Sequence, residues 1–271
     1  MNARTGPWTK VALTVMAVLT LAPFVWMVIS SLKTFAETMT MPPTLLPDNP
    51  TLDNFVTVTE RIPFFTLLWN TIVVSAAEVV LTVIIASLAA YALSILDLPG
   101  KGIILVALLA VMMVPGEIFM IPQYQIIAAL GLTDTLTALI LPSVFSVFGA
   151  FLMVQTFTSI PKEMVEAARL DGAGHFTTFF RIVLPNAKGG MTALAVITLL
   201  GSWTSLLWPI VVNRSMDKFT LGPGLAMLRG SFFTESNIMM AAGVMAAIPM
   251  ILFFLLIQKQ FIQGITQSGM K

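Results

Sequence analysis

The chain has 271 residues, of which 57% are hydrophobic and 10% are charged, and its 14 basic side chains nearly balance 13 acidic ones. Soluble domains carry about 25% charged residues, so this composition excludes an ordinary soluble domain and predicts a membrane protein. The charge balance argues against nucleic acid as a partner. The sequence has no cysteine, which excludes disulfides and thiol catalysis, and its single histidine, His175, excludes a metal site built from several histidines.

Six stretches are apolar enough and long enough to cross a membrane as helices. A hydrocarbon core of ~30 Å needs roughly 20 helical residues. The predicted spans are residues 11–32, 69–95, 103–121, 136–157, 190–212 and 238–258. The predicted fold class is therefore all-α, a polytopic protein in which residues 1–271 form a single transmembrane domain. Six spans also place both termini on the same side of the membrane.

The first span follows Arg4 and Lys10, as the apolar core of a signal peptide would. Its apolar run is longer than the ~7–15 residues of such a core, and no small-residue cleavage site follows it. We therefore expect an uncleaved first helix.

The second and third spans each contain one acidic residue, Glu78 and Glu117. A charge in lipid is costly, so Glu78 is expected to face the helix bundle, either in a transport role or in a hydrogen bond to a neighbouring helix. Pro115 and Pro122 interrupt the third apolar stretch, so its helix is expected to end near Pro115. Non-helical backbone at membrane depth needs protein or water around it, which predicts that this turn, with Glu117, lies near the outer mouth of a pathway.

The longest charge-bearing segment, residues 159–188, lies between the fourth and fifth spans. Ser159 is predicted to cap a helix over residues 162–170, with Pro161 in its first turn. Two glycines are predicted to stop this helix, because glycine adopts the left-handed conformation without a steric penalty. They are Gly172 and Gly174.

A second short helix is predicted to follow and to end at Pro185. Its four large apolar residues are spaced so that they share one helical face. They are Phe176, Phe179, Phe180 and Val183. Two short amphipathic helices cannot build a core of their own. Their apolar faces are therefore expected to rest on lipid headgroups, on another part of this chain, or on a partner protein.

The fifth span ends in a region with three candidate pathway residues, Trp203, Ser205 and Trp208. Tryptophan faces and a hydroxyl suit the stacking and hydrogen bonding of a sugar, but tryptophans near the end of a span are also common interfacial anchors. Asn213 is a further polar candidate. The residues leave both interpretations open.

Lysine and arginine positions predict the orientation. With the N-terminus in the cytoplasm, nine of the 14 basic residues lie inside and five outside. The inside residues are Arg4, Lys10, Lys101, Lys162, Arg169, Arg181, Lys188, Lys259 and Lys271. This bias places the two termini and residues 159–188 in the cytoplasm. Loops 33–67 and 214–235 are then external, either as solvated connectors or as surfaces for an external partner.

The segment 159–188 resembles the EAA loop of ATP-binding-cassette (ABC) importer permeases. The matching residues are Glu166-Ala167-Ala168, Gly172, Ile182 and Leu184-Pro185. Further runs look like the smaller permease of maltose-type sugar importers: Val114-Pro115, Ile121-Pro122, Gly131-Leu132, Asp171-Gly172-Ala173 and Phe261 to Thr266. Two departures stand out. Gly189-Gly190 replace a common proline, which is expected to loosen the entry to the fifth span, and Ser94-Ile95 replace a commonly basic stretch.

The resemblance implies a type I ABC importer permease in the bacterial cytoplasmic (inner) membrane. It implies that the first short helix is a coupling helix that docks on a dimer of ATP-binding subunits, which bind ATP and Mg. The implied coupling residues are Glu166, Ala167, Ala168, Asp171, Gly172, Ile182, Leu184 and Pro185. A second permease, an extracytoplasmic solute-binding protein and a sugar or oligosaccharide are the other implied partners.

The chain has no nucleotide-binding motif of its own, because Ile95 stands where the first glycine of a phosphate-binding loop before Gly100-Lys101 would be. ATP hydrolysis is therefore expected in another chain, and no catalytic set predicts an enzyme. Two alternatives remain. One is an importer permease for a non-sugar solute, and the other is an ion-coupled secondary transporter that uses Glu78.

Overall fold

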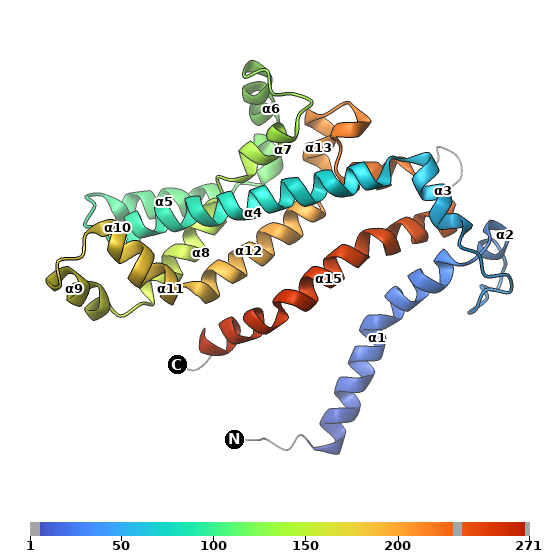
Figure 1. The fold of residues 1–271 in the computed structure, drawn as a ribbon, viewed down its shortest axis with the longest axis horizontal. Helices are drawn as coiled ribbons and strands as arrows, with labels where there is room; N and C mark the ends of the chain where they lie inside the picture. The colour runs from blue at the N-terminus through green and yellow to red at the C-terminus, as the bar shows by residue number, and fades with distance from the viewer. Residues whose placement is uncertain (1–5, 230–234, 269–271) are drawn as a thin grey trace. The chain divides into compact units, whose positions relative to one another are not determined.

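The structure is a computed structural model that describes residues 6–229 and 235–268, with side chains described to Leu255 and at Gln258. All regular elements in these ranges are helices, which confirms the all-α prediction for this part of the chain (Figure 1). The chain divides into two compact units. One comprises Met1–Phe65 with Gly224–Leu252, and the other comprises Thr66–Pro223 with Phe253–Lys271.

The first unit is built on α1 (Pro7–Ser31), α2 (Phe35–Thr38), α3 (Asp53–Arg61) and the beginning of α15 (Ser236–Ser268). Buried asparagines join them. The Asn54 amide donates to the Ser31 and Lys33 carbonyls at 2.7 and 2.8 Å, and the Asn237 amide donates to Asn54 Oδ1 at 2.7 Å. The end of α1, α3 and the start of α15 therefore share one hydrogen-bonded junction.

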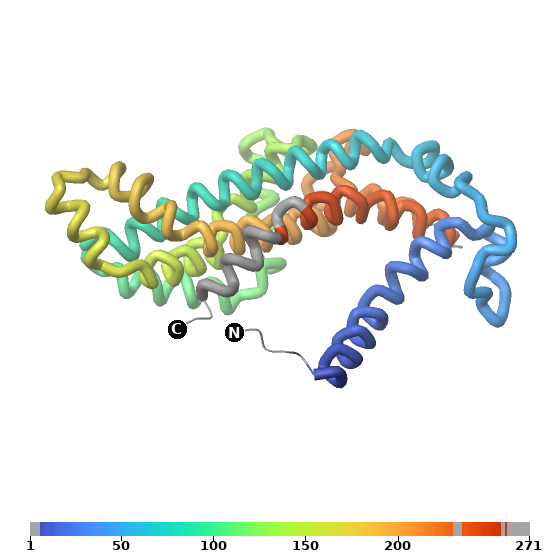
Figure 2. The backbone as a smooth tube through the Cα atoms, turned by 60° about the horizontal axis from the view of Figure 1, so that its bottom comes forward, coloured from blue at the N-terminus to red at the C-terminus, as the bar shows by residue number. Residues whose placement is uncertain are grey.

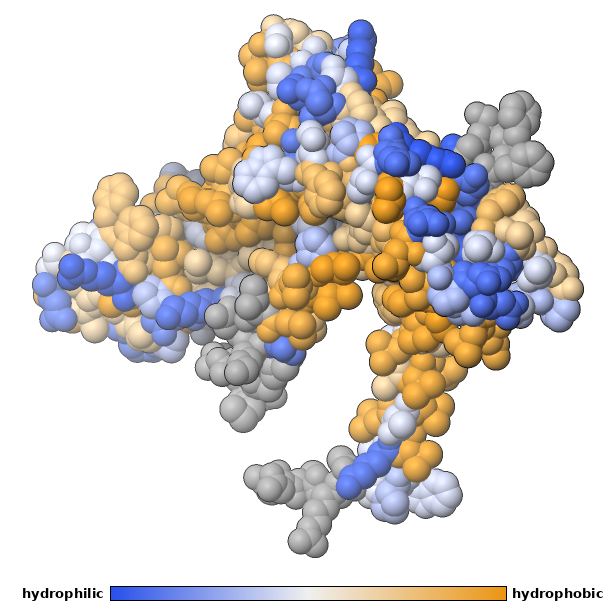
Figure 3. All heavy atoms as spheres, turned by 45° about the vertical axis from the view of Figure 1, so that its right-hand side comes forward, coloured by the Kyte–Doolittle hydropathy of each residue, from blue (hydrophilic) through white to orange (hydrophobic). Residues whose placement is uncertain are grey.

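Most of α1 has no cover from its own chain. Its apolar side chains are exposed along nearly the whole helix, and only Ser30 and Ser31 at its end are buried. The exposed apolar side chains of α1 form the narrow orange projection at the lower right of Figure 3. A helix that is apolar all round needs lipid or another protein around it.

The loop after α1 is held together by Glu37, whose carboxylate accepts hydrogen bonds from the backbone N–H groups of Thr34, Asp48 and Asn49.

The second unit contains the remaining helices, apart from the first two residues of α4 and the part of α14 from Gly224 on, and Figure 2 shows them as a continuous trace. In chain order these are α4 (Phe64–Ser94), α5 (Lys101–Met112), η1 (Gly116–Phe119), α6 (Met120–Ala129), α7 (Leu136–Ser143), α8 (Val147–Thr158), α9 (Lys162–Leu170), α10 (His175–Thr178), η2 (Phe179–Val183), α11 (Leu184–Asn186), α12 (Lys188–Trp203), α13 (Leu207–Val212), η3 (Met216–Lys218) and α14 (Leu221–Met227). Its longest helix, α4, contributes to two buried clusters. One includes Ala86, Tyr91 and Phe157, and the other includes Val74 and Leu139.

In the part of the chain that the structure describes, three helices are long and apolar enough to cross a membrane: α1, α4 and α15 as far as Leu255. Three bent pairs also qualify, which gives up to six spans if each pair is one span. The bends are 95° between α5 and Gly116–Ala129, 45° between α7 and α8, and 75° between His175–Asn186 and α12. The predicted break near Pro115 is confirmed, because α5 ends at Met112 and Pro115 begins the next turn. The predicted interruption at Pro122 is wrong, because Pro122 lies in the first turn of α6, where a missing N–H is tolerated.

Besides residues 103–121, two further predicted spans are not single helices in the structure. Residues 136–157 break between α7 and α8, where the Ser146 hydroxyl caps the new helix by accepting from the Gly149 N–H at 2.9 Å. Residues 190–212 break after Trp203. Pro209 has no N–H to donate to the Ser205 carbonyl and its ring would collide with that carbonyl in a continuous helix, so the chain restarts as α13.

The glycines at the start of the fifth predicted span do not loosen it. Helix α12 begins at Lys188, and Gly190 lies directly against α8. A Cβ at Gly190 would approach Thr156 Oγ1 to 2.2 Å. Small residues allow helix backbones to approach closely, so Gly190 supports a tight contact here.

Candidate functional site

The first helix of segment 159–188 is confirmed, because α9 covers Lys162–Leu170. The predicted cap is wrong. Pro161 occupies the N-cap position without a side-chain hydrogen bond, whereas the Ser159 hydroxyl donates to the Thr156 carbonyl at 2.7 Å and belongs to the end of α8.

The prediction for Gly172 is also confirmed. Its φ is +82°, which lies in the left-handed region. Its N–H donates to the Arg169 carbonyl at 3.0 Å, and the Ala173 N–H donates to the Ala168 carbonyl at 2.9 Å. These two bonds form a Schellman motif, which satisfies carbonyls at the end of a helix. Gly174 has a different role, since it is the N-cap of α10 with φ −70°.

The second helix differs from the prediction in two ways. Pro185 does not end it, because the chain passes from α10 through the π-helical turn η2 into α11, and the Leu184 N–H donates to the Phe179 carbonyl five residues earlier. The wider turn precedes the position where a proline ring would meet the Arg181 carbonyl in an α-helix. The predicted single apolar face is also wrong. Phe179 and Val183 are buried.

The other two phenylalanines of this helix point to the surface. Phe176 is 80% exposed and Phe180 is 60% exposed, and Leu170 at the end of α9 is 89% exposed. Single exposed apolar residues are normal on a soluble protein. Here four large ones, including Met164 on α9, lie on one short charged segment, which is typical of a surface that contacts a partner.

The inner side of the segment is attached to the end of α4. The Tyr91 ring packs edge-on against Phe179 with centroids 5.2 Å apart, and its hydroxyl donates to the His175 carbonyl at 3.2 Å. Val165 and Val183 join the same buried cluster. α9, η2 and the end of α4 therefore form one packed body.

The eight predicted coupling residues divide between the surface and this packed body. Ala168 is 8% exposed and packs inside the chain, so Ala167 alone of the two alanines offers a surface. Ile182 and Leu184 are half-buried. The exposed ones are Glu166, Ala167, Asp171, Gly172 and Pro185.

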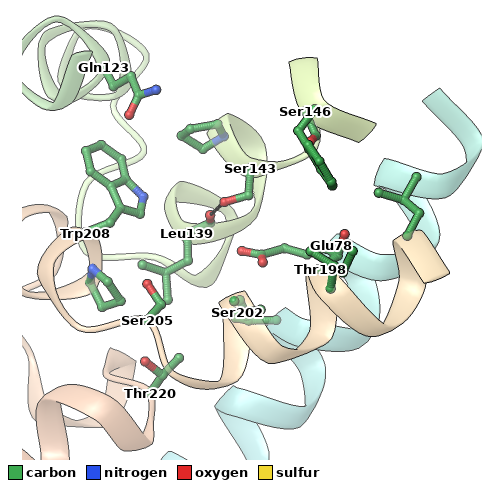
Figure 4. A pocket seen from close by; sticks show the side chains of 17 residues that line it. Glu78, Gln123, Leu139, Ser143, Ser146, Thr198, Ser202, Ser205, Trp208 and Thr220 are labelled. Carbon is green, nitrogen blue, oxygen red and sulfur yellow. Dashed lines mark hydrogen bonds between the residues drawn. The ribbon is translucent and has the colours of Figure 1, made fainter. Parts of the chain in front are cut away.

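Polar side chains from several helices surround a cavity of about 360 Å³. Figure 4 shows Glu78 reaching from α4 into the space between α7 and α12. The structure brings Glu78, Ser205 and Trp208 together on this cavity, whereas Trp203 is not among its lining residues. Asn213 lies elsewhere, where its amide donates to the Lys218 carbonyl at 2.8 Å.

The remaining polar lining was not predicted from sequence. It consists of Gln123, Ser143, Ser146, Thr198, Ser202 and Thr220. Thr198 and Ser202 are four residues apart on α12, so their hydroxyls lie on one side of this apolar helix, and Ser205 follows three residues later, just beyond its end. That spacing is the signal that could have located the cavity.

Several of these side chains are held in place by their own hydrogen bonds. The Ser75 hydroxyl donates to the Ser202 hydroxyl at 3.0 Å, and Ser202 lies beside the Glu78 carboxyl group. The Trp208 N–H donates to the Ala138 carbonyl at 3.0 Å, which fixes the indole plane. The Thr220 hydroxyl is buried with no protein partner.

A family model described as "binding-protein-dependent transport system inner membrane component" matches residues 2–267. The chain belongs to this family. It is therefore an inner-membrane permease subunit of an ABC transporter and not an enzyme, as the residues of segment 159–188 led us to expect.

Relatives of this permease match it from end to end. The arabinooligosaccharides transport system permease protein AraQ of Halalkalibacterium halodurans is 34% identical over 278 residues, with 100% of both chains covered. The sulfoquinovosyl glycerol transport system permease protein SmoH of Agrobacterium fabrum is 32% identical, with 98% of this chain and 94% of the relative covered. A solved bacterial ABC transporter involved in the import of the acidic polysaccharide alginate has the same fold. Its TM-score is 0.82 at 24% identity, over 96% of this chain and 99% of that chain.

The permease has a second cavity of about 410 Å³ beside the first, and the two share Gln123, Ser205 and Trp208 in their linings. Glu117 lines the second cavity. Among the residues that the structure describes, no three His, Asp or Glu side chains gather in a way that would hold a metal ion.

A polar clamp ties together two helices of the permease that line the first cavity. Asp134, just before α7, has φ +61° and accepts hydrogen bonds at 2.9 Å from the backbone N–H groups of Arg214 and Ser215, just after α13. The Ser215 hydroxyl also donates to it. The hydrogen bonds from Ser215, followed by the bond from Arg214, lower the pKa of Asp134 to about 2.

Proposed function

We propose that this permease forms half of the translocation pathway of an ATP-driven importer for a sugar or oligosaccharide. A second permease would complete the pathway, a dimer of ATP-binding subunits with ATP and Mg would drive it, and an extracytoplasmic binding protein would deliver the solute. The names of AraQ and SmoH support a carbohydrate solute. A cavity lined by hydroxyls, an amide and an indole supports the same class, because these groups hydrogen-bond and stack on sugar rings.

We propose six spans with both termini in the cytoplasm. The three long helices and three bent pairs support this number. The excess of basic residues on the proposed inner side supports the orientation, although Arg4 and Lys271 lie outside the described residues. The exposed apolar surface of α1 fits lipid and the second permease as its surroundings.

We propose that α9 docks on an ATP-binding subunit and that Glu166 faces it. The observation that carries this proposal is the two-sided build of segment 159–188. Val165 and Ala168 point into the packed body, while Glu166 and Ala167 remain exposed on the same helix. A carboxylate beside a small residue can pair with a partner's arginine while the backbones approach closely.

Helix α4 offers a route from the docking surface to the pathway. Tyr91, near its end, contacts segment 159–188, and Glu78, 13 residues earlier, lines the cavity. At a rise of 1.5 Å per residue, these positions are about 20 Å apart on one continuous helix. Movement of the segment when the ATP-binding subunits close would thus displace a cavity wall as a rigid body, which is one form of two-state switching.

The test is co-purification with the cognate ATP-binding subunit after Glu166→Lys. We expect the variant to insert in the membrane but to lose the subunit, because the new ammonium group would face the arginine that Glu166 pairs with. Asp97→Lys is the matched control, since Asp97 is an exposed carboxylate on the same proposed side but outside the segment. It should retain the subunit.

The chain contains no cysteine, so single cysteines at Ala167 and Asp97 also permit clean crosslinking. We expect a crosslink to the ATP-binding subunit from position 167 and none from position 97. Unchanged co-purification of Glu166→Lys would refute the docking assignment. ATP-independent uptake by the purified chain alone would refute the importer itself in favour of a secondary transporter.

A further inference from the structure

We propose that the cavity around Glu78 accepts an uncharged, hydroxyl-rich saccharide and rejects an acidic one. This inference rests on the proposed function, which supplies the saccharide but leaves its charge open. The solutes in the names of the similar proteins include an acidic polysaccharide, so family membership does not decide the matter. The composition of the cavity does.

The described lining of the two adjoining cavities carries no positive charge. Among the residues that the structure describes, those around the cavities include two ionisable groups, Glu78 and Glu117, and no lysine, arginine or histidine. A carboxylate, sulfonate or phosphate that leaves water needs a cation or several aimed N–H donors. A carboxyl side chain supplies no positive charge in either protonation state, and when ionised it repels an anion.

The cavity lining also supplies hydrogen-bond acceptors and hydroxyl groups for a saccharide. Glu78 is 6% exposed and extends into the cavity, so its carboxyl group can accept hydrogen bonds from sugar hydroxyls there (Figure 4). Thr198 and Ser205, both half-buried on the same cavity, add hydroxyl groups that can bond a ligand. A neutral saccharide satisfies these groups without leaving a buried charge unpaired.

The indole of Trp208 offers an apolar face to a ligand in the cavity. The Ala138 carbonyl already takes the Trp208 N–H, so this indole cannot donate to an anion and offers its apolar face instead. Stacking on a sugar ring uses that face. A volume of about 360 Å³ is near the low end of small-molecule sites, which span ~300–1,000 Å³, so it fits a short stretch of saccharide.

The test uses the complete detergent-purified transporter complex and four probes. Three are neutral trisaccharides, namely maltotriose, xylotriose and arabinotriose, and one is the acidic trimer trigalacturonate. Binding is followed by quenching of tryptophan fluorescence, with Trp208→Phe identifying the signal from the cavity. We expect at least one neutral trisaccharide to bind about tenfold or more tightly than trigalacturonate, because one unpaired charge in a buried site costs at least that ratio.

Charge reversal gives the sharper result. Glu78→Lys should shift the ratio of acidic to neutral affinity toward trigalacturonate by about tenfold or more, since the ammonium now pairs with a uronate. Glu78→Gln should remove the discrimination only in part. Glu60→Lys makes the same charge change on an exposed residue outside the cavity and should leave the ratio unchanged.

Three outcomes would overturn the proposal. They are wild-type affinity for trigalacturonate equal to that for the neutral trimers, no binding of any neutral trimer, or an unchanged ratio in Glu78→Lys while its melting temperature matches the wild type. None of these outcomes affects recovery of the ATP-binding subunit. Failure of the charge selection is therefore distinguishable from failure of the proposed function, which shows as loss of that subunit from the wild-type complex.

Discussion

The two functional regions along α4 place their polar groups in opposite ways. At the Tyr91 end, some apolar residues of segment 159–188 pack inward, and its charged residues face solvent together with Leu170, Phe176 and Phe180. Around Glu78, the polar groups face inward onto a cavity while much of the outer surface of α4 is apolar and exposed. The difference fits the two proposed roles, because a docking surface must meet water before its partner arrives, whereas a pathway must be shielded from lipid. The predictions below test each half of this comparison, beginning with the largest expected effect.

Gly172→Pro should destroy the docking surface and spare the cavity. Proline fixes φ near −65°, whereas Gly172 has φ +82°. Proline also lacks the backbone N–H with which Gly172 donates a hydrogen bond to the Arg169 carbonyl. We expect recovery of the ATP-binding subunit to fall below about a tenth of wild type, with trisaccharide binding unchanged, because helix-breaking by proline costs ~3 kcal/mol or more. Both are measured on one purified sample.

Gly174→Ala is the control for that substitution. Gly174 has φ −70°, and a Cβ there would meet no atom within 4 Å. Its complex should match the wild type. Normal subunit recovery in Gly172→Pro would show that the elbow does not position α9 for docking.

Tyr91→Ala should free the segment from α4. Loss of a buried aromatic side chain costs ~3–5 kcal/mol, and this one packs on Phe179. We expect faster hydrogen exchange in residues 162–186 and unchanged exchange in the cavity part of α12. Tyr91→Phe keeps the ring and loses only the bond to the His175 carbonyl, so its effect should be ~0.5–1.5 kcal/mol. Equal exchange in both variants would contradict a packed contact at Tyr91.

Segment 159–188 is the part of the molecule whose local structure the sequence predicted best. Its helix at 162–170 and its turn at Gly172 follow from local rules of helix periodicity and glycine conformation, and the structure confirms both. The error came at Phe176 and Phe180, which were expected to share one helical face with Phe179 and Val183 but are exposed while the other two are buried. The π-helical turn before Pro185 divides that face, and a regular 3.6-residue period cannot anticipate it.

The cavity, in contrast, could not be predicted from local sequence rules. Glu78, Ser205 and Trp208 could be singled out as unusual in apolar spans, but nothing local indicated that α4, α7, α12 and α13 would bring them together. The breaks at Ser146 and after Trp203 create that arrangement. Both were missed because the stretches are long and uncharged, and Pro142 and Pro209 were not read as helix breaks. Tertiary packing decides where such helices bend.

Gly190→Ala tests whether α12 transmits the arrangement of the docking end to the cavity. The new methyl group would meet Thr156 on α8 and force the two helices apart. Overpacking costs ~1–3 kcal/mol, so we expect a lower melting temperature in detergent and weaker trisaccharide binding. Gly201→Ala is the control on the same helix, because a Cβ there meets nothing within 4 Å. It should be neutral or stabilising by up to ~1 kcal/mol. Equal melting temperatures for the two variants would argue against the close contact.

The smallest effect is expected at the clamp beside the cavity. The folded pKa of Asp134 is about 2, below the ordinary 3.8, so its ionised form stabilises the fold at all pH values above the ordinary pKa and that stabilisation is lost as pH falls toward 2. Asp134→Asn should therefore melt at a lower temperature than the wild type by an amount that is constant from pH 8 to pH 5. The difference should shrink below about pH 4, as Asp134 of the wild type binds a proton.

Asp217→Asn is the control, because it removes an exposed carboxylate from the same loop that pairs with neighbouring Lys218. It should change the melting temperature little. A difference for Asp134→Asn that already narrows between pH 7 and pH 5 would mean that the hydrogen bonds from Ser215 and Arg214 do not hold this carboxylate ionised. The clamp would then not be what joins α7 to α13 at the cavity.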